Sequence, residues 1–229
     1  MVIFIALQYC LSSFRALSIN RQGKVNAART VIVIPSVERF KQDYLINTLE
    51  DLFRDQRALS GDYIFLVMLS YSNHTYLSNI TSIIRVSDHP KNLETFPFGE
   101  NKDQNYYSWR ARQNLDYSYL LNHVFNHFSF TYYLHLEDDI TVTSLYLQKM
   151  EEFINATLPD SDWSMISFCN LGFIGKLFKK SDLPFLESMF KAFYKAIPCD
   201  WILELFILGR TGGTVESRIS LQLKGKVRV

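Results

Sequence analysis

The stretch that most constrains the fold is Tyr132-Tyr133-Leu134-His135-Leu136-Glu137-Asp138-Asp139-Ile140, where a mostly apolar run passes directly into three carboxylates. A short apolar run of this kind predicts a buried strand. Burying a carboxylate without a partner costs several kcal/mol. We therefore expect the strand to end at a cleft with the acids facing a cation, since ligands collect outside the carboxyl ends of strands in open α/β sheets. The alternative is an ordinary acidic turn that leaves the sheet for solvent, because exposed carboxylates are the usual case.

The remaining pattern predicts one α/β domain with a mostly parallel, twisted sheet flanked by helices. Apolar runs predict strands, and apolar residues at helical spacing predict helices. The expected strands are 31–34, 63–69, 83–86, 132–136 and 163–168. The expected helices are 44–57, 109–126, 146–154, 186–193 and 200–208, with a loop at 89–107 and a glycine-bearing turn with exposed aromatics at 170–176. The domain is expected to span 31–208, between a weakly apolar segment at 1–30 and an irregular, truncated or divergent tail at 209–229.

Composition excludes few classes of protein. The formal net charge is +1 and no basic run occurs, so a nucleic-acid partner is not indicated. The three cysteines match neither a disulfide framework nor a zinc motif. The first seventeen residues are too short and too interrupted by polar side chains for a membrane span, which leaves a weak targeting segment, a packed element or the ragged start of an incomplete chain.

Three Asn-X-Thr sequons favour a secretory route. They begin at Asn73, Asn79 and Asn155, and each fits the acceptor pattern for N-glycosylation. Such triplets also arise by chance, so the preference is mild.

The first strand and helix open like a nucleotide-binding unit, but no glycine-rich phosphate loop lies between them. Phosphates bound there would need another source of positive charge, such as a metal ion. Farther along, Arg110 or Arg112 on the helix at 109–126 could face the acids or a diphosphate, which suits a guanidinium fork. The same polar face could equally be a solvated one.

Several blocks, in this order and spacing, resemble the catalytic domain of the N-acetylglucosaminyltransferase IV enzymes, glycosyltransferase family 54. The resemblance covers about residues 31–208. The blocks are Ile34-Pro35-Ser36-Val37 with Arg39; Tyr44-Leu45-Ile46; Trp109-Arg110 with Gln113-Asn114-Leu115-Asp116-Tyr117; Leu136-Glu137-Asp138-Asp139-Ile140; Leu171-Gly172-Phe173-Ile174-Gly175-Lys176; and Phe193-Tyr194-Lys195 with Pro198 and Asp200-Trp201.

The resemblance implies a GT-A fold and inverting transfer of GlcNAc from UDP-GlcNAc, in β1,4 linkage, to the α1,3-mannose arm of N-glycans in the Golgi. It implies that Glu137-Asp138-Asp139 is the counterpart of a DXD motif, with Asp139 as ligand of a divalent cation, Mn²⁺ or else Mg²⁺. Asp200 is the expected catalytic base, although an Asp at this place is also an ordinary N-cap. The donor nucleotide is expected to contact the acids Glu137 and Asp138 and a further set of residues. That set is Pro35, Ser36, Arg39, Trp109, Arg110 and Gln113.

Asp139 and Asp200 should open onto one cleft about 8–12 Å apart, somewhat farther than the two carboxyl groups of inverting hydrolases. Glu204 and Glu187 are the next acids to consider as a base.

Three departures from the family bear on activity. The membrane anchor and stem, the region after the catalytic domain and a late histidine metal ligand have no counterpart, since the last histidine is His135. The chain is therefore expected to be a fragment, a mis-predicted gene model or a degenerate member, and membrane association is expected only if an anchor is missing from it. The competing interpretation is an inactive relative that binds glycans or other glycosyltransferases and regulates them. A plain lectin has little support, because nothing in a lectin requires the acid-ended strand.

Overall fold

A computed structural model describes residues 28–37, 44–70, 83–86, 103–157, 163–210 and 212. Its contacts divide the chain into two compact units. The first unit comprises residues 1–85 and 129–161, and the second comprises 86–128 and 162–229. The expected domain limits at residues 30 and 208 remain predictions.

The first unit is built on strands in the order β3-β2-β1-β4, with β1 (Ala28–Val37), β2 (Tyr63–Ser70), β3 (Ile83–Val86) and β4 (Phe130–His135). β1 pairs parallel with both β2 and β4. Residues 31–34 of β1 have no exposed surface, and all of β2 is buried. Such continuous apolar runs are typical of parallel strands that are covered on both faces. The predicted α/β class and the parallel pairing of β1 with β2 and with β4 are confirmed.

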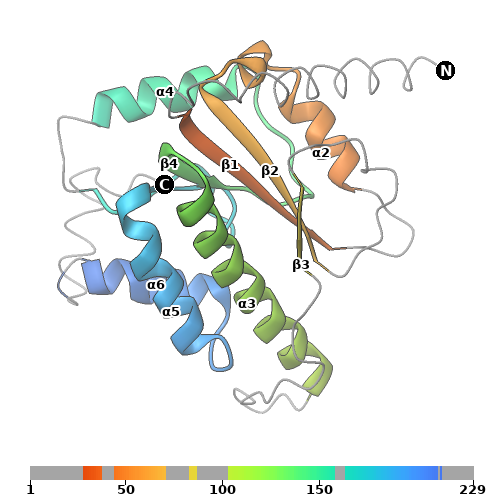
Figure 1. The fold of residues 1–229 in the computed structure, drawn as a ribbon, viewed down its shortest axis with the longest axis vertical. Coiled ribbons are helices and arrows are strands. Elements are labelled where there is room, and N and C mark those ends of the chain that lie inside the picture. Colours follow the sequence, from red (N-terminus) through yellow and green to blue (C-terminus); the bar gives the residue numbers. More distant parts are fainter. Residues whose placement is uncertain are drawn as a thin grey trace. The chain divides into compact units, whose positions relative to one another are not determined.

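Helices α2 (Tyr44–Leu52) and α4 (Tyr146–Thr157) and the 3-10 helix η2 (Gln56–Leu59) complete the described part of this unit (Figure 1). The buried face of α2 carries Leu45, Thr48, Leu49 and Leu52. This spacing of three and four residues places one stripe of the helix against the core.

The second unit contains α3 (Gln104–His127), β5 (Ile166–Ser167), β6 (Lys176–Lys179), η4 (Lys180–Asp182), α5 (Leu183–Phe193) and α6 (Cys199–Arg210). Helix α3 packs against α5 and α6 (Figure 1). The core of this unit is aromatic: the ring of Tyr117 lies 5.3 Å from that of Phe173 and 5.9 Å from that of Phe190. β5 and β6 form a short antiparallel pair.

Four details of the sequence-based prediction were wrong. Helix α3 begins at Gln104 within the expected loop, because the Asp103 carboxylate accepts the amide hydrogens of Asn105 and Tyr106 and caps the helix. The strand expected at 163–168 is only two residues long, and the strand 176–179 was not predicted. Phe173 is fully buried rather than exposed. Gly172 and Gly175 have φ values of 40° and 65°, which let the turn double back and carry Phe173 into the core.

Some predictions fall outside the described residues, namely those on the segment 1–27, Arg39, Asn73, Asn79, most of the loop 89–107 and the tail 213–229.

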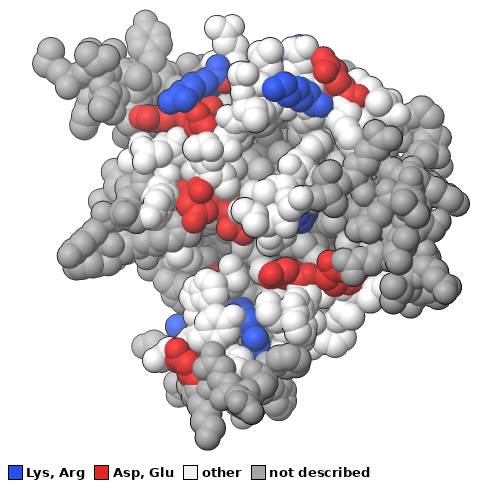
Figure 2. Space-filling model, turned by 180° about the vertical axis from the view of Figure 1, so that it is seen from behind, with Lys and Arg blue, Asp and Glu red and all other residues white. Residues whose placement is uncertain are grey.

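Within the described part, no helix combines the length and apolar character needed to cross a bilayer. On the face drawn in Figure 2, the described acidic and basic side chains are interspersed rather than gathered by sign.

The burial of His135, the last residue of β4, leads to a testable prediction about how stability depends on pH. Its imidazole has no exposed surface, and its Nδ1 lies 2.9 Å from the Tyr133 hydroxyl. Burial holds the pKa of His135 well below its ordinary value of 6.5. As pH falls below 6.5 the unfolded chain therefore binds a proton that the folded chain does not, and stability decreases.

Between pH 7 and pH 5, His135 should remove about 2 kcal/mol of the free energy of unfolding. Urea unfolding of the wild type and of His135→Gln at both pH values measures this. The variant should lose about 2 kcal/mol less than the wild type over the same interval. Equal losses in the two proteins would contradict the assignment.

Candidate functional site

The acidic turn after β4 lies beside the end of β1. In the parallel register Val33 is opposite His135, and the Leu136 amide donates to the Val33 carbonyl at 2.9 Å. Ser36 and Asp138 each lie three residues after this pair, and the Ser36 hydroxyl donates to Asp138 Oδ2 at 2.6 Å. The carboxyl end of β1 and the acidic turn therefore share one edge of the sheet, where α/β proteins gather ligands.

The three acids of this turn occupy different environments. Asp138 is only 4% exposed, Glu137 is half-buried and Asp139 is exposed. A buried carboxylate requires hydrogen-bond donors, and Ser36 supplies one to Asp138. Asp139 is the most exposed of the three acids.

Helix α2 and the turn after it hold the segment that follows the acids. The Thr48 hydroxyl lies 2.8 Å from the Asp138 carbonyl oxygen and accepts the Ile140 amide at 3.2 Å. Asp51 Oδ2 accepts the Val142 amide at 2.6 Å, and Asp55 Oδ2 accepts the Leu147 amide at 3.3 Å at the start of α4.

These three acceptors, Thr48, Asp51 and Asp55, follow one another at intervals of three and four residues, so they line one side of the helix and its extension. They satisfy backbone groups of a segment that belongs to no strand, which fixes the path of the acidic turn.

The acidic turn carries the residues that could hold a divalent cation. Among the described residues, no group of three or more His, Cys, Asp or Glu side chains converges as a ready-made cage. Mn²⁺ and Mg²⁺ do not need one, because they bind through one or two carboxylates together with substrate phosphates and water. The exposed Asp139 with the half-buried Glu137 fits that mode, in which the substrate completes the site.

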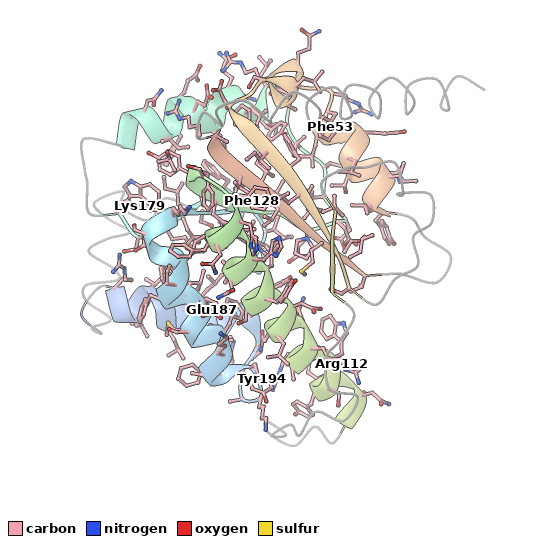
Figure 3. The ribbon with its side chains drawn as sticks, viewed as in Figure 1. Phe53, Arg112, Phe128, Lys179, Glu187 and Tyr194 are labelled. Atoms are coloured by element: carbon pink, nitrogen blue, oxygen red, sulfur yellow. The ribbon has the colours of Figure 1, made fainter. Side chains whose placement is uncertain are left out.

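In the second unit, two buried side chains of α3 hold the segment that leads to Asp200. Asn114 Nδ2 donates to the carbonyl oxygens of Tyr194 and Ile197, at 3.1 and 2.9 Å. Arg110 Nη2 donates to the Ala196 carbonyl at 3.1 Å. Tyr194 lies just beyond the end of α5 (Figure 3). One helical turn of α3 therefore satisfies three carbonyl groups between α5 and α6.

Asp200 is the exposed second residue of α6. A carboxylate in the first turn of a helix is favoured by the helix dipole. The thiol of the buried Cys199 lies 3.2 Å from Asp200 Oδ1 and 3.9 Å from Gln113 Oε1. Asp200 therefore combines an accessible carboxylate with a fixed backbone. Of the two alternative bases, Glu204 is half-buried in α6. Glu187 is 9% exposed, accepts from Ser118 and pairs with Lys191 at 2.6 Å.

The other expected nucleotide contacts are spread over both units. Pro35 directly precedes Ser36 in β1 and is half-buried. Trp109 is 52% exposed and its ring lies 6.1 Å from that of Tyr106. Arg110 is 4% exposed and its guanidinium lies 4.9 Å from the Tyr107 ring centre. Since Asp139 belongs to the first unit and Asp200 to the second, their expected separation stays a prediction.

Several residues that shape these sites were not selected from the sequence. Thr48 and Asp51 read as ordinary positions of an amphipathic helix, and Asn114 as part of a polar face. The available signal was a polar residue on the buried stripe of a helix, since such a residue must find a partner. Thr48 is 1% exposed and Asn114 has no exposed surface.

Together, the parallel strands and the acids at their carboxyl edge define an α/β protein of the kind that binds ligands at strand ends. Residues 15–212 match the family described as "MGAT4 conserved region". The chain belongs to this family.

Named relatives agree with this assignment. The chain is 32% identical over 203 residues to human alpha-1,3-mannosyl-glycoprotein 4-beta-N-acetylglucosaminyltransferase B, covering 80% of this chain and 36% of the relative. The bovine A enzyme is 29% identical over 198 residues, covering 76% of this chain and 35% of the relative.

A rat relative, the alpha-1,3-mannosyl-glycoprotein 4-beta-N-acetylglucosaminyltransferase-like protein MGAT4D, is 31% identical over 214 residues, covering 86% of this chain and 56% of the relative. The chain thus spans about a third of the length of the two enzymes and little more than half of the third relative.

Asp138 is buried and its neighbour Asp139 is exposed, so mutations at the two places should change stability by different amounts. Ser36→Ala should lower the free energy of unfolding by about 1.5–3 kcal/mol, because it removes a hydrogen bond to the buried Asp138 carboxylate. Asp139→Asn, at the exposed neighbour, should change it by less than about 0.5 kcal/mol. Chemical unfolding of both variants measures the difference. Equal effects would show that Asp138 does not depend on Ser36.

The hold of α3 on the segment 194–197 can be tested by proteolysis. Asn114→Ala removes two hydrogen bonds to this segment and should expose the Lys195–Ala196 bond to trypsin. Asn122→Ala changes an exposed Asn of the same helix and is the matched control. Mass spectrometry should show faster cleavage after Lys195 in Asn114→Ala only. The same rate in both variants and in the wild type would contradict the assigned role.

Proposed function

We propose that this chain is the catalytic portion of an inverting glycosyltransferase of GT-A type. It transfers GlcNAc from UDP-GlcNAc, in β1,4 linkage, to the α1,3-mannose arm of N-glycans on glycoproteins in the Golgi. The observation that carries the proposal is the exposed carboxylate of Asp139 at the carboxyl edge of β1 and β4, in a chain of the MGAT4 family. The names of the human and bovine relatives state the acceptor and the linkage.

The donor nucleotide is proposed to bind at that edge, beside Pro35 and Ser36. Asp139, with Glu137 beside it, would hold a divalent cation, Mn²⁺ or Mg²⁺, which supplies charge neutralisation for a diphosphate leaving group. The absence of a glycine-rich loop after β1 supports this role for the acids, because some other group must balance the phosphates. Asp138 would act indirectly: its buried carboxylate, held by Ser36, fixes the turn that carries Asp139.

Asp200 is proposed as the base. The hydroxyl oxygen of the acceptor mannose forms a bond to the anomeric carbon of GlcNAc, and the bond from that carbon to the diphosphate breaks. UDP leaves with the electron pair, and the hydroxyl proton passes to Asp200. Asn114 and Arg110 would hold the segment that orients this carboxylate. Trp109 and Gln113 are proposed to border the bound donor, and Arg39 to contact it.

A second candidate function is a non-catalytic relative that binds glycans or other glycosyltransferases and regulates them. The similarity to rat MGAT4D, which is named as a transferase-like protein, favours this alternative. The absence of a three-residue metal cluster among the described residues is compatible with both candidates, since substrate phosphates can complete a site.

Direct assay separates the two candidates. The chain, extended to the length of its relatives, is incubated with UDP-GlcNAc and a biantennary N-glycan, with and without Mn²⁺. Transfer that depends on Mn²⁺ supports the enzyme. Binding of the glycan without transfer supports the non-catalytic relative.

Two variants should fail in different ways. Asp139→Ala should weaken UDP binding about tenfold or more in calorimetry, and excess Mn²⁺ should restore part of it. Asp200→Asn should keep the donor affinity and lower kcat by roughly 10²–10⁴-fold, because it removes only the proton acceptor. Asp62→Ala, at the opposite edge beside the start of β2, is the control. Unchanged turnover in Asp200→Asn would leave Asp200 with a structural role only.

A further inference from the structure

A polar network surrounds Asn155, near the end of α4, at the edge of the sheet where the parallel strands begin. Glu151 of α4 accepts a hydrogen bond from the Tyr63 hydroxyl at the start of β2 and pairs with Arg57 at 3.1 Å. Arg29, at the start of β1, lies 3.9 Å from the same carboxylate and donates to Asn155 Oδ1 at 2.6 Å. These contacts hold α4 against the amino ends of β1 and β2.

Asn155 is also the first residue of the sequon Asn155-Ala156-Thr157. It is exposed, and it is the one sequon asparagine within the described ranges. Its carbonyl oxygen is turned toward the guanidinium of Arg29. An arginine only donates hydrogen bonds, so the Arg29 contact identifies the oxygen and leaves the Nδ2 nitrogen as the other end of the carboxamide. No hydrogen bond from Nδ2 occurs within the described part.

We propose that Asn155 carries an N-linked glycan and that Arg29 holds the linking amide through its carbonyl oxygen. The inference rests on the secretory route that belongs to the proposed function. In the reaction, Nδ2 forms a bond to the anomeric carbon of an oligosaccharide carried on a lipid pyrophosphate. The bond from that carbon to the pyrophosphate breaks, the lipid pyrophosphate leaves with the electron pair, and the amide releases one proton.

The folded structure accommodates the product of this reaction. Glycosylation converts a primary amide into a secondary amide and keeps its carbonyl acceptor, so the bond from Arg29 survives. The glycan is attached at an exposed residue and has no buried surface to displace. The structure therefore gives no reason for a glycosylated chain to misfold.

The position also leaves the proposed donor site open. Arg29 and Ser36 lie seven residues apart in β1, which at the rise of a strand corresponds to about 23 Å. A glycan at the Arg29 end is therefore separated from Ser36 and the acidic turn by most of the length of the sheet. We expect it to affect solubility and stability rather than donor binding.

The test uses the full chain, expressed behind a secretory signal peptide in eukaryotic cells. The purified protein is treated with peptide N-glycosidase F in ¹⁸O-labelled water, and its peptides are analysed by mass spectrometry. Asn155 should be converted to ¹⁸O-labelled Asp. Thr157→Ala should abolish the label at Asn155, whereas Thr157→Ser, which keeps the sequon, should retain it. These two variants leave Asn155 itself unchanged.

An unmodified Asn155 in secreted protein whose signal peptide has been removed would overturn the inference, whether or not Asn73 and Asn79 are occupied. Asn155→Gln should bind UDP with the affinity of the glycosylated protein, and a tenfold loss would overturn the separation of the two regions. A glycosylated Asn155 in a chain that, extended to the length of its relatives, neither binds UDP nor transfers GlcNAc would uphold this inference and contradict the proposed function.

Discussion

The arrangement of the first unit depends on one buried hydrogen bond, from the Ser36 hydroxyl to the Asp138 carboxylate. The parallel register of β1 and β4 brings the two residues level, three positions beyond the pair Val33 and His135. With Asp138 turned inward, its neighbour Asp139 is presented outward at the edge of the sheet. Thr48 and Asp51 then hold the backbone beyond it. Burial of one acid thus sets the exposure of the next.

In the second unit, buried polar side chains also fix a loop, but they donate hydrogen bonds to backbone carbonyl groups. Asn114 and Arg110 lie on the buried side of α3 and donate to carbonyl groups of the segment between α5 and α6. A segment outside regular structure has unpaired carbonyl groups, and polar side chains from a neighbouring helix are the means of satisfying them. In both units a helix therefore orders a loop near an exposed acidic residue. Asp139 lies within the loop of the first unit, and Asp200 lies at the start of α6, directly after the loop of the second.

Much of the fold could be predicted from apolar runs in the sequence. Residues 31–34 of β1, for example, are buried on both faces of the sheet and are therefore all apolar. The position of Asp139 after the end of a buried strand could also be predicted from the sequence. The roles of Thr48, Asn114 and Arg110 were not identified. A polar residue on the buried stripe of a helix signals that it has a partner, but the sequence does not say which backbone group that partner is. The start of α3 was missed because the capping Asp103 lies among polar residues typical of a loop. Phe173 was placed outside because two glycines flank it, whereas their positive φ values direct it inward.

The central claim is that Asp139 marks a site for UDP and a divalent cation at the carboxyl edge of β1 and β4. Its most direct test is a crystal structure of the chain, extended to the length of its relatives, grown with UDP and Mn²⁺ and measured at a wavelength where manganese scatters anomalously. We predict one anomalous peak beside the Asp139 carboxylate, with the uridine near Pro35 and Ser36. Bound UDP with its manganese at any other place, or no binding of either, would contradict the account.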